Sequence, residues 1–197
     1  MQQGRKLVVT FLVLGYAAAA LCLGACSAQQ KTAATAAAPS PAERGRYLAT
    51  VGQCNDCHTP GTLFGGPNMT RQLAGSEVGW HGPWGTSFAR NLTPDPETGL
   101  GNWTEDEIVS TLKTGVRKDG TTLLPPMPWP NTSQWTDEDL HAVAAYLKSL
   151  PPVKHEVPKA LPPDGKYSGP VIPFPAPGPW DAPATAPDAA AGAKPAK

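Results

Sequence analysis

The chain has 197 residues with 16 basic and 16 acidic side chains, so its formal net charge is zero. It has no lysine- and arginine-rich cluster, which excludes nucleic acid as the obvious partner. Of the 24 prolines, 13 lie between Pro151 and Pro195, while alanine and threonine dominate residues 27–38. Such segments bury too little apolar surface to offset their ordering entropy. Residues 41–152 remain, which is enough for one small packed domain.

Residues 1–25 are typical of a secretory signal, since Arg5 and Lys6 precede an apolar run and then small residues. The signal ends in Leu-Gly-Ala-Cys26, which resembles the bacterial lipobox, where the chain is cut before a cysteine that becomes acylated. We therefore expect a lipoprotein, with Cys26 as the lipid attachment site and several acyl chains as a firm membrane anchor. The alternative is an ordinary signal peptide with an incidental cysteine. Residues 26–40 then form a flexible tether.

Three helices are predicted within residues 41–152. The first runs from about Ala42 to Cys57, with an apolar stripe of Tyr47, Leu48 and Val51. No segment shows the sustained alternation of a strand, so the fold class is predicted to be all-α.

The other two helices have clear boundaries. The second begins at Thr104, where Thr-Glu-Asp-Glu forms a capping box, and ends near Gly115. The third begins at Thr136 and ends at Leu150, before two prolines. The predicted core positions on these two helices are Ile108, Val109, Leu112, Leu140, Val143, Ala144 and Leu147.

The sequence Cys54-Asn-Asp-Cys57-His58 carries the chemistry. Two thiols three positions apart lie on one helical turn, so both can reach the two vinyl groups at one edge of a haem. The adjacent His58 is then placed beneath the iron as its proximal ligand, which makes the spacing specific for c-type haem attachment.

Three alternatives explain this motif less well. A structural zinc site needs two further ligands at comparable spacing, and His81, His141 and His155 each stand alone. A thioredoxin-like redox pair needs a strand–helix context that the sequence lacks. A disulfide between the two cysteines leaves His58 unexplained.

A six-coordinate iron also needs a distal ligand, and Met127 is the favoured one. It lies in Pro125-Pro126-Met127-Pro128, where the prolines fix φ and produce a stiff loop between two predicted helices. The alternatives are Met69, which follows His58 closely in a loop, and one of the histidines. We expect all three remaining histidines to be solvated.

These residues resemble class I cytochrome c, and more narrowly the haem domains of bacterial membrane dehydrogenase cytochrome c subunits. The resemblance covers residues 41–153. It is carried by the segments Arg44–Leu48, Cys54–His58, Asn91–Asp95, Thr98–Trp103, Pro126–Pro128 and Tyr146–Pro152.

The resemblance implies a class I cytochrome c fold, with about three main helices around one covalent haem c and long loops. Cys54 and Cys57 would form thioethers, and His58 and Met127 would bind the iron. It further implies that the first helix packs on the last near Gly45 and Tyr146, and that the segment at Arg90 and Asn91 reaches the haem propionates. Such subunits usually carry three haem domains in one chain, whereas this sequence has one such motif.

The expected function is transfer of single electrons between a periplasmic dehydrogenase and an oxidase or another cytochrome, without enzymatic activity. One alternative is a catalytic haem subunit acting on a small redox substrate, and another is a structural or haem-sensing lipoprotein. The expected location is a periplasm-facing membrane surface, held through the lipid anchor. In the proline- and alanine-rich tail, residues 153–197, we expect packing as far as Trp180 and disorder beyond it.

Overall fold

A computed structural model of the chain describes residues 38–176 and 178. The signal segment with Cys26, most of the tether, and the tail from residue 179 onward lie outside the described residues. None of the helices that are described has both the length and the apolar character needed to cross a membrane. The elements below all belong to the unit that begins at Pro39.

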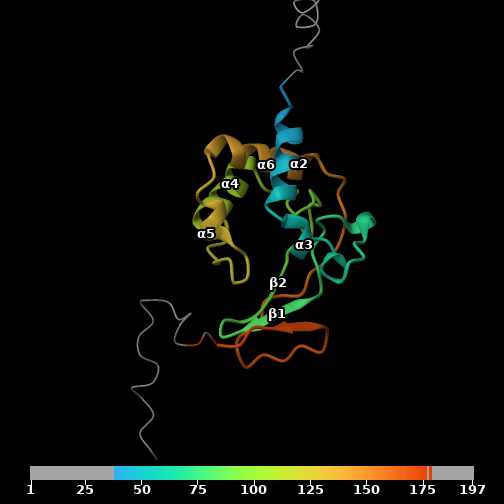
Figure 1. Cartoon of the computed structure of the whole chain (residues 1–197), viewed down its shortest axis with the longest axis vertical. Helices are drawn as coiled ribbons and strands as arrows, with labels where there is room; N and C mark the ends of the chain where they lie inside the picture. Colours follow the sequence, from blue (N-terminus) through green and yellow to red (C-terminus); the bar gives the residue numbers. More distant parts are fainter. Residues whose placement is uncertain (1–37, 177, 179–197) are drawn as a thin grey trace, which may run out of the picture. The chain divides into compact units, whose positions relative to one another are not determined.

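Two helices that are far apart in the sequence pack against each other in the upper part of this unit (Figure 1): α2 (Pro41–Val51) and α6 (Asp137–Ser149). Gly45 lies at the crossing, where an added Cβ would be 1.8 Å from the carbonyl oxygen of Ala142 and 2.8 Å from Cβ of Tyr146. Only glycine permits so close an approach of the two backbones. The packing near Gly45 and Tyr146 that the resemblance implies is therefore confirmed.

The third main helix, α4 (Glu105–Thr114), packs on α6. Its capping box is formed as predicted, because Thr104 Oγ1 accepts a hydrogen bond from the Glu107 amide and Glu107 accepts one from the Thr104 amide. At the start of α6, the hydroxyl of Thr136 accepts a hydrogen bond from the amide of Asp139, which is a simple N-cap. Local capping chemistry thus sets both helix starts where the sequence places them.

The first predicted helix is wrong at its end. It stops at Val51, and a separate short helix, α3 (Cys54–His58), begins after Gln53, whose φ of 58° is left-handed. Gly52 at the break lies against Trp135, since an added Cβ would be 2.8 Å from that ring. The break turns the two cysteines and His58 onto an axis of their own.

The predicted stripe of the first helix is also wrong in part. Leu48 is buried, but Tyr47 and Val51 are 57% and 54% exposed. The buried residues of α2 are Gly45, Leu48 and Ala49, and two of these three are small, as the close approach of α6 at Gly45 requires. The buried hydrophobic cluster comprises Leu48, Ala49, Leu73, Ile108, Val109, Leu140, Ala142, Val143, Ala144, Tyr146 and Leu147.

A small sheet corrects the all-α expectation. Strands β1 (Gly79–Gly82) and β2 (Gly85–Phe88) pair antiparallel, and β3 (Val171–Pro173) pairs parallel to β1, giving the order β2-β1-β3. The far side of β2 pairs with Leu161, whose amide and carbonyl both bond to Thr86. The fold is thus mostly helical, with a small sheet that the sequence did not predict. Short helices α5 (Trp129–Thr132), η2 (Thr62–Phe64) and η3 (Met69–Arg71) complete it.

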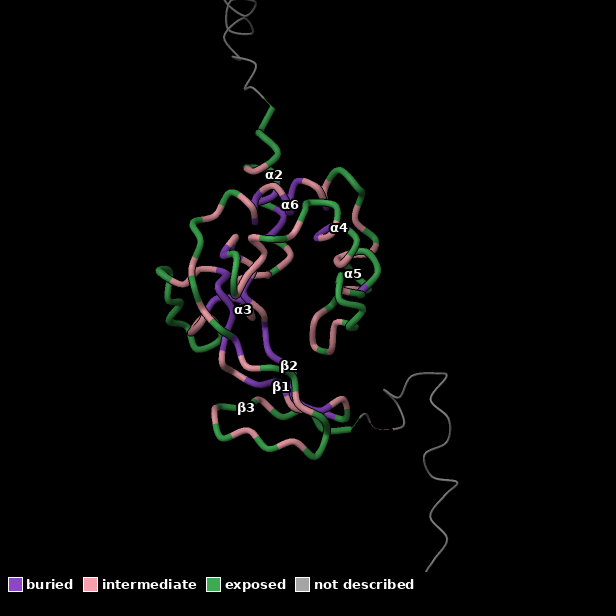
Figure 2. The backbone as a smooth tube through the Cα atoms, turned by 180° about the vertical axis from the view of Figure 1, so that it is seen from behind, coloured by how far each residue is buried: buried purple, intermediate pink, exposed green. Residues whose placement is uncertain are grey.

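The segment after α6 returns along the domain to reach this sheet. Val157 is buried, and the ring of Tyr167 packs edge-on against Phe88 with centroids 4.9 Å apart. Figure 2 shows buried backbone in purple near α6, α3 and the β1–β2 hairpin, and Figure 1 shows the returning segment in orange on its way from α6 to β3. Residues 153–176 therefore pack on the domain in part, at Val157 and Tyr167 among others, which agrees with the partial packing expected for the first part of the tail.

Candidate haem site

The two cysteines lie on the single turn of α3 and both thiols are free and half-buried. Burial raises the pKa of Cys54 to about 11. Burial, and then the charge of Asp56, also raise the pKa of Cys57. Both side chains are therefore neutral thiols near pH 7 in the absence of a metal. Among the described residues, no group of three or more histidine, cysteine, aspartate or glutamate side chains could hold a metal ion, so the further ligands of a structural zinc site are not brought to these thiols.

His58 follows Cys57 directly in the sequence, and its ring is buried. Its Nδ1 lies 2.7 Å from the carbonyl oxygen of Arg90, so Nδ1–H donates and the lone pair is left on Nε2. Burial lowers the pKa of His58, although the bond to the Arg90 carbonyl opposes this shift. The imidazole is consequently neutral, with its tautomer and its orientation fixed by one backbone oxygen.

The other nitrogen of this ring has no protein partner among the described residues. Nε2 makes no hydrogen bond there, and no buried side-chain nitrogen or oxygen in the described part is unpaired. Nε2 must therefore face accessible space, although the rest of the ring is enclosed. A buried, neutral imidazole that presents one free lone pair has the properties of an axial metal ligand.

The backbone that supports His58 depends on Gly75. Its amide donates to the His58 carbonyl oxygen at 2.8 Å, and its φ is +87°. An added Cβ would be 2.5 Å from Cγ2 of Val157 and 2.8 Å from the carbonyl oxygen of Ala89. Gly75 thus contacts three parts of the chain: the returning tail, the segment that carries Arg90, and the backbone of His58. The sequence alone did not single out this glycine.

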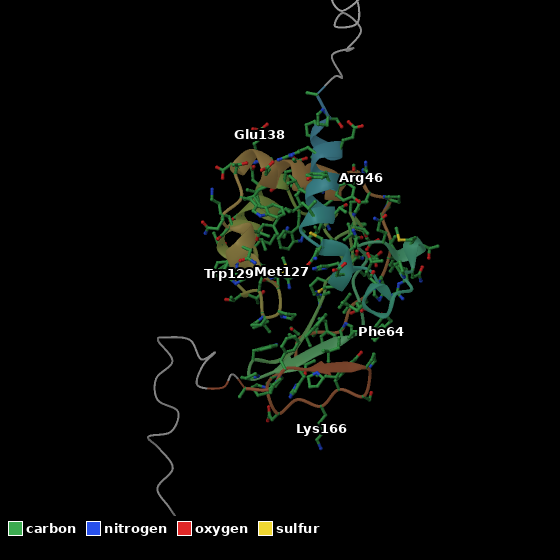
Figure 3. All side chains as sticks on the ribbon, viewed as in Figure 1. Arg46, Phe64, Met127, Trp129, Glu138 and Lys166 are labelled. Atoms are coloured by element: carbon green, nitrogen blue, oxygen red, sulfur yellow. The ribbon has the colours of Figure 1, made fainter. Side chains whose placement is uncertain are left out.

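Met127 lies in the loop between α4 and α5, and Figure 3 shows it between the ribbons of α5 and α3. Its side chain is partly buried, whereas Met69 on η3 is 59% exposed. These positions favour Met127 as the thioether available to the interior of the domain.

The other histidines are occupied elsewhere. His141 bonds to Asp106. His81, which was also expected to be solvated, lies in β1, is partly buried and bonds to Thr86. His155 was expected to be solvated, but its side chain is 12% exposed and bonds to Glu77 and to the carbonyl oxygen of Ala74. The sequence missed this because the partners of His155 come from a loop about 80 residues earlier.

Contact of the Arg90–Asn91 segment with the propionates stays a prediction, and the side chains of this segment have partners within the protein. The buried amide of Asn91 donates to Thr98 and to the carbonyl of Val153, and its oxygen accepts from Thr93. The side chain therefore fixes the start of the tail and has no free capacity. The guanidinium of Arg90 donates to the carbonyls of Val157 and Pro158.

The donor set fits a covalently bound haem. Two neutral thiols on one turn match the two vinyl groups at one haem edge, one imidazole nitrogen is free, and a thioether stands in a stiff loop. This combination, inside a mostly helical domain of about 110 residues, defines a c-type cytochrome domain. The cytochrome c family matches residues 42–151, more than half of the chain, and the chain belongs to that family. Members of this family carry covalently bound haem c.

The chain is also similar to larger proteins. It is 35% identical over 147 residues to the cytochrome c subunit of alcohol dehydrogenase (quinone) from Gluconobacter oxydans, covering 75% of this chain and 27% of the relative. It is 37% identical over 105 residues to the gluconate 2-dehydrogenase cytochrome c subunit of Pantoea cypripedii, covering 53% and 22%. It is 36% identical over 115 residues to a dihaem c-type cytochrome of Cereibacter sphaeroides, covering 57% and 36%.

The chain therefore spans about a fifth to a third of the length of these relatives. The two dehydrogenase relatives are named as cytochrome c subunits, which are electron-transfer components rather than catalytic enzymes. The expectation that this chain is not itself an enzyme agrees with these names and with the family.

Proposed function

We propose that the chain is a monohaem class I cytochrome that transfers single electrons at a periplasm-facing membrane surface. One Cys-x-x-Cys-His motif in 197 residues supports one haem, held by thioethers to Cys54 and Cys57. The observation that carries the proposal is the His58 ring, buried with Nδ1 bonded to Arg90 and with Nε2 free beside two free thiols.

When bound, the haem supplies an iron that accepts and releases one electron. His58 would bind this iron through Nε2, and the Arg90 carbonyl keeps that ring in place. Met127 would supply a sulfur ligand, which stabilises the ferrous state relative to bis-histidine ligation. With both ligands supplied by the protein, no position would be left open to a substrate, which favours a carrier over a catalyst.

The proposed electron donor is a dehydrogenase, which the names of the relatives support, and the acceptor is an oxidase or another cytochrome. The loop after His58 exposes Leu63, Phe64 and Met69, and a shallow pocket beside it is lined by Cys57 and Phe64. A small apolar surface near the thioether edge suits a weak encounter that dissociates quickly.

Covalent attachment is the first test. The chain is expressed with the haem-ligation machinery, and its pigment should remain on the protein in acidified acetone. Changing both Cys54 and Cys57 to serine should leave colourless protein. A wild-type protein that is colourless, or that loses its pigment to the acid solvent, would refute the proposal.

The distal ligand is tested separately. Ferric protein should show the sulfur-to-iron charge-transfer band, Met127→Ala should abolish it, and Met69→Ala is the matched control that should retain it. Loss of the band in Met69→Ala but not in Met127→Ala would overturn this ligand assignment while leaving the cytochrome itself intact.

The lipid anchor at Cys26 and the electron donor need tests in cells. Cys26→Ser should lose incorporated fatty acid and move the cytochrome from the membrane fraction to the soluble fraction. Deletion of the gene should slow electron flow from a periplasmic dehydrogenase to oxygen. Unchanged lipid labelling in Cys26→Ser would refute the anchor, and unchanged respiration on every dehydrogenase substrate would refute the shuttle.

A further inference from the structure

The loop that carries Met127 has little support of its own. Its two ends are held, because the Leu123 amide donates to the Gly115 carbonyl at 2.7 Å and the Trp129 amide donates to Met127 at 2.9 Å. Between them, three prolines at 125, 126 and 128 have no N–H to donate. A stiff loop anchored only at its ends can still move as a body.

One side chain outside the loop bonds to its middle. Ser87 Oγ lies 2.5 Å from the carbonyl oxygen of Pro125, two residues before Met127. Within the described part of the chain, every other hydrogen bond of residues 124–128 stays inside 124–132. The Trp80 carbonyl also lies near Oγ, but at 3.5 Å, so the single hydroxyl hydrogen goes to Pro125.

Ser87 is itself firmly placed. It lies in β2, buried, opposite Trp80 of β1, while the neighbouring Thr86 exchanges two backbone hydrogen bonds of 2.9 Å with Leu161 on the other side. A strand paired on both edges is a rigid support for a donor. In Figure 1 the loop that precedes α5 extends toward this hairpin.

We propose that Ser87 is a positioning residue for the distal ligand, holding the Met127 loop through the Pro125 carbonyl so that the sulfur stays at bonding distance from the iron. The inference rests on Met127 being that ligand, as in the proposed function. It makes the β1–β2 hairpin part of the support of the redox site.

Competition with imidazole at the ferric iron tests this role. Imidazole binds only when the sulfur leaves, so its apparent affinity reports how well the protein retains Met127. In Ser87→Ala the affinity for imidazole should increase about threefold to tenfold, since a buried neutral hydrogen bond is lost. The charge-transfer band should also disappear at a lower pH than in the wild type.

Matched variants separate positioning from general loosening. Thr86→Val changes the neighbouring residue on the same strand. The hydroxyl that it removes bonds to the His81 ring and not to the Met127 loop. This variant should bind imidazole as the wild type does. Ser87→Thr keeps the hydroxyl and should restore wild-type affinity, and Ser87→Cys, a weaker donor of similar size, should give an intermediate increase if Ser87→Ala does not fold.

The outcomes are distinct. Wild-type imidazole affinity in Ser87→Ala or Ser87→Cys, or an equal increase in Thr86→Val, overturns the role of Ser87 and leaves the proposed function standing. A wild-type protein that lacks the charge-transfer band overturns Met127 as ligand, and the role of Ser87 with it.

Discussion

The carbonyl oxygen of Arg90 lies 2.7 Å from Nδ1 of His58, 32 residues away in the sequence. This single contact settles which nitrogen of the ring is free. Because the acceptor is a backbone atom, the arrangement tolerates a change of side chain at position 90 but not a displacement of its main chain.

Gly75→Ala should produce that displacement. The added Cβ would meet Val157, the Ala89 carbonyl and the Arg90 backbone within 3 Å. The clash should cost about 1–3 kcal/mol, in addition to about 1–2 kcal/mol of left-handed strain. In the ferrous protein, NMR should show faster solvent exchange of the His58 Nδ1 proton.

Gly120→Ala is the control for this prediction. Its φ of +81° carries the same strain, but nothing lies within 4 Å of an added Cβ. If both variants lose equal stability and keep equally slow proton exchange, the support of His58 by Gly75 is refuted.

Gly45→Ala should separate α2 from α6. A Cβ placed 1.8 Å from the Ala142 carbonyl forces the helices apart, and the loss in the free energy of unfolding should be at least about 1–3 kcal/mol by overpacking. Gly66→Ala, where a Cβ meets nothing within 4 Å, should change it by less than about 0.5 kcal/mol. Denaturant unfolding of both variants measures this, and similar midpoints would contradict the close crossing.

Val157→Ala tests whether the returning tail is part of the core. Val157 is buried against Gly75, so losing two methyl groups should cost about 1–3 kcal/mol through lost burial and a residual cavity. Val171→Ala removes the same atoms from an exposed position in β3 and should cost much less. Equal costs in urea unfolding would mean that the tail only lies on the surface.

The acid side of the stability profile should depend on Asp95. The hydroxyl and the amide of Thr98 donate to its carboxylate and hold the pKa of Asp95 below its usual range. The unfolded chain regains an ordinary pKa of about 3.9, so below roughly pH 5 it binds protons that the folded state does not. The contribution of Asp95 to the free energy of unfolding is complete above its pKa in the unfolded chain. It is lost as the pH falls through its lower pKa in the folded state.

Asp95→Asn should therefore make the free energy of unfolding depend less on pH on the acid side. The amide oxygen can still accept the bonds from Thr98, but the side chain no longer titrates. Urea midpoints measured from about pH 6 down to about pH 3 should fall less steeply in the variant than in the wild type. Parallel curves would show that Asp95 makes no such contribution.

The helices were predictable because their signals are local. Thr104 and Thr136 cap the helices that follow them, and the Pro pair after Leu150 prevents further helix. The break at Gln53 was not predictable, since a left-handed glutamine there is imposed by the packing of Gly52 on Trp135. The sheet was missed because its strands have three or four residues, and one of them comes from a proline-rich tail.

The thiols, His58 and Met127 were proposed from spacing and proline content, and the structure places α3 and the Met127 loop without contradiction. What surrounds them could not be read from the sequence. The Arg90 carbonyl is a backbone atom with no sequence signal of its own, and Ser87 is an ordinary serine until the hairpin brings it to Pro125.

The parallel pairing of β3 with β1 joins residues that are about 90 positions apart. In the order of synthesis, the strand that completes the sheet therefore comes long after Cys54 and Cys57. Until residues 171–173 are in place, β1 lacks its parallel partner, and the hairpin that carries Ser87 has one unpaired edge.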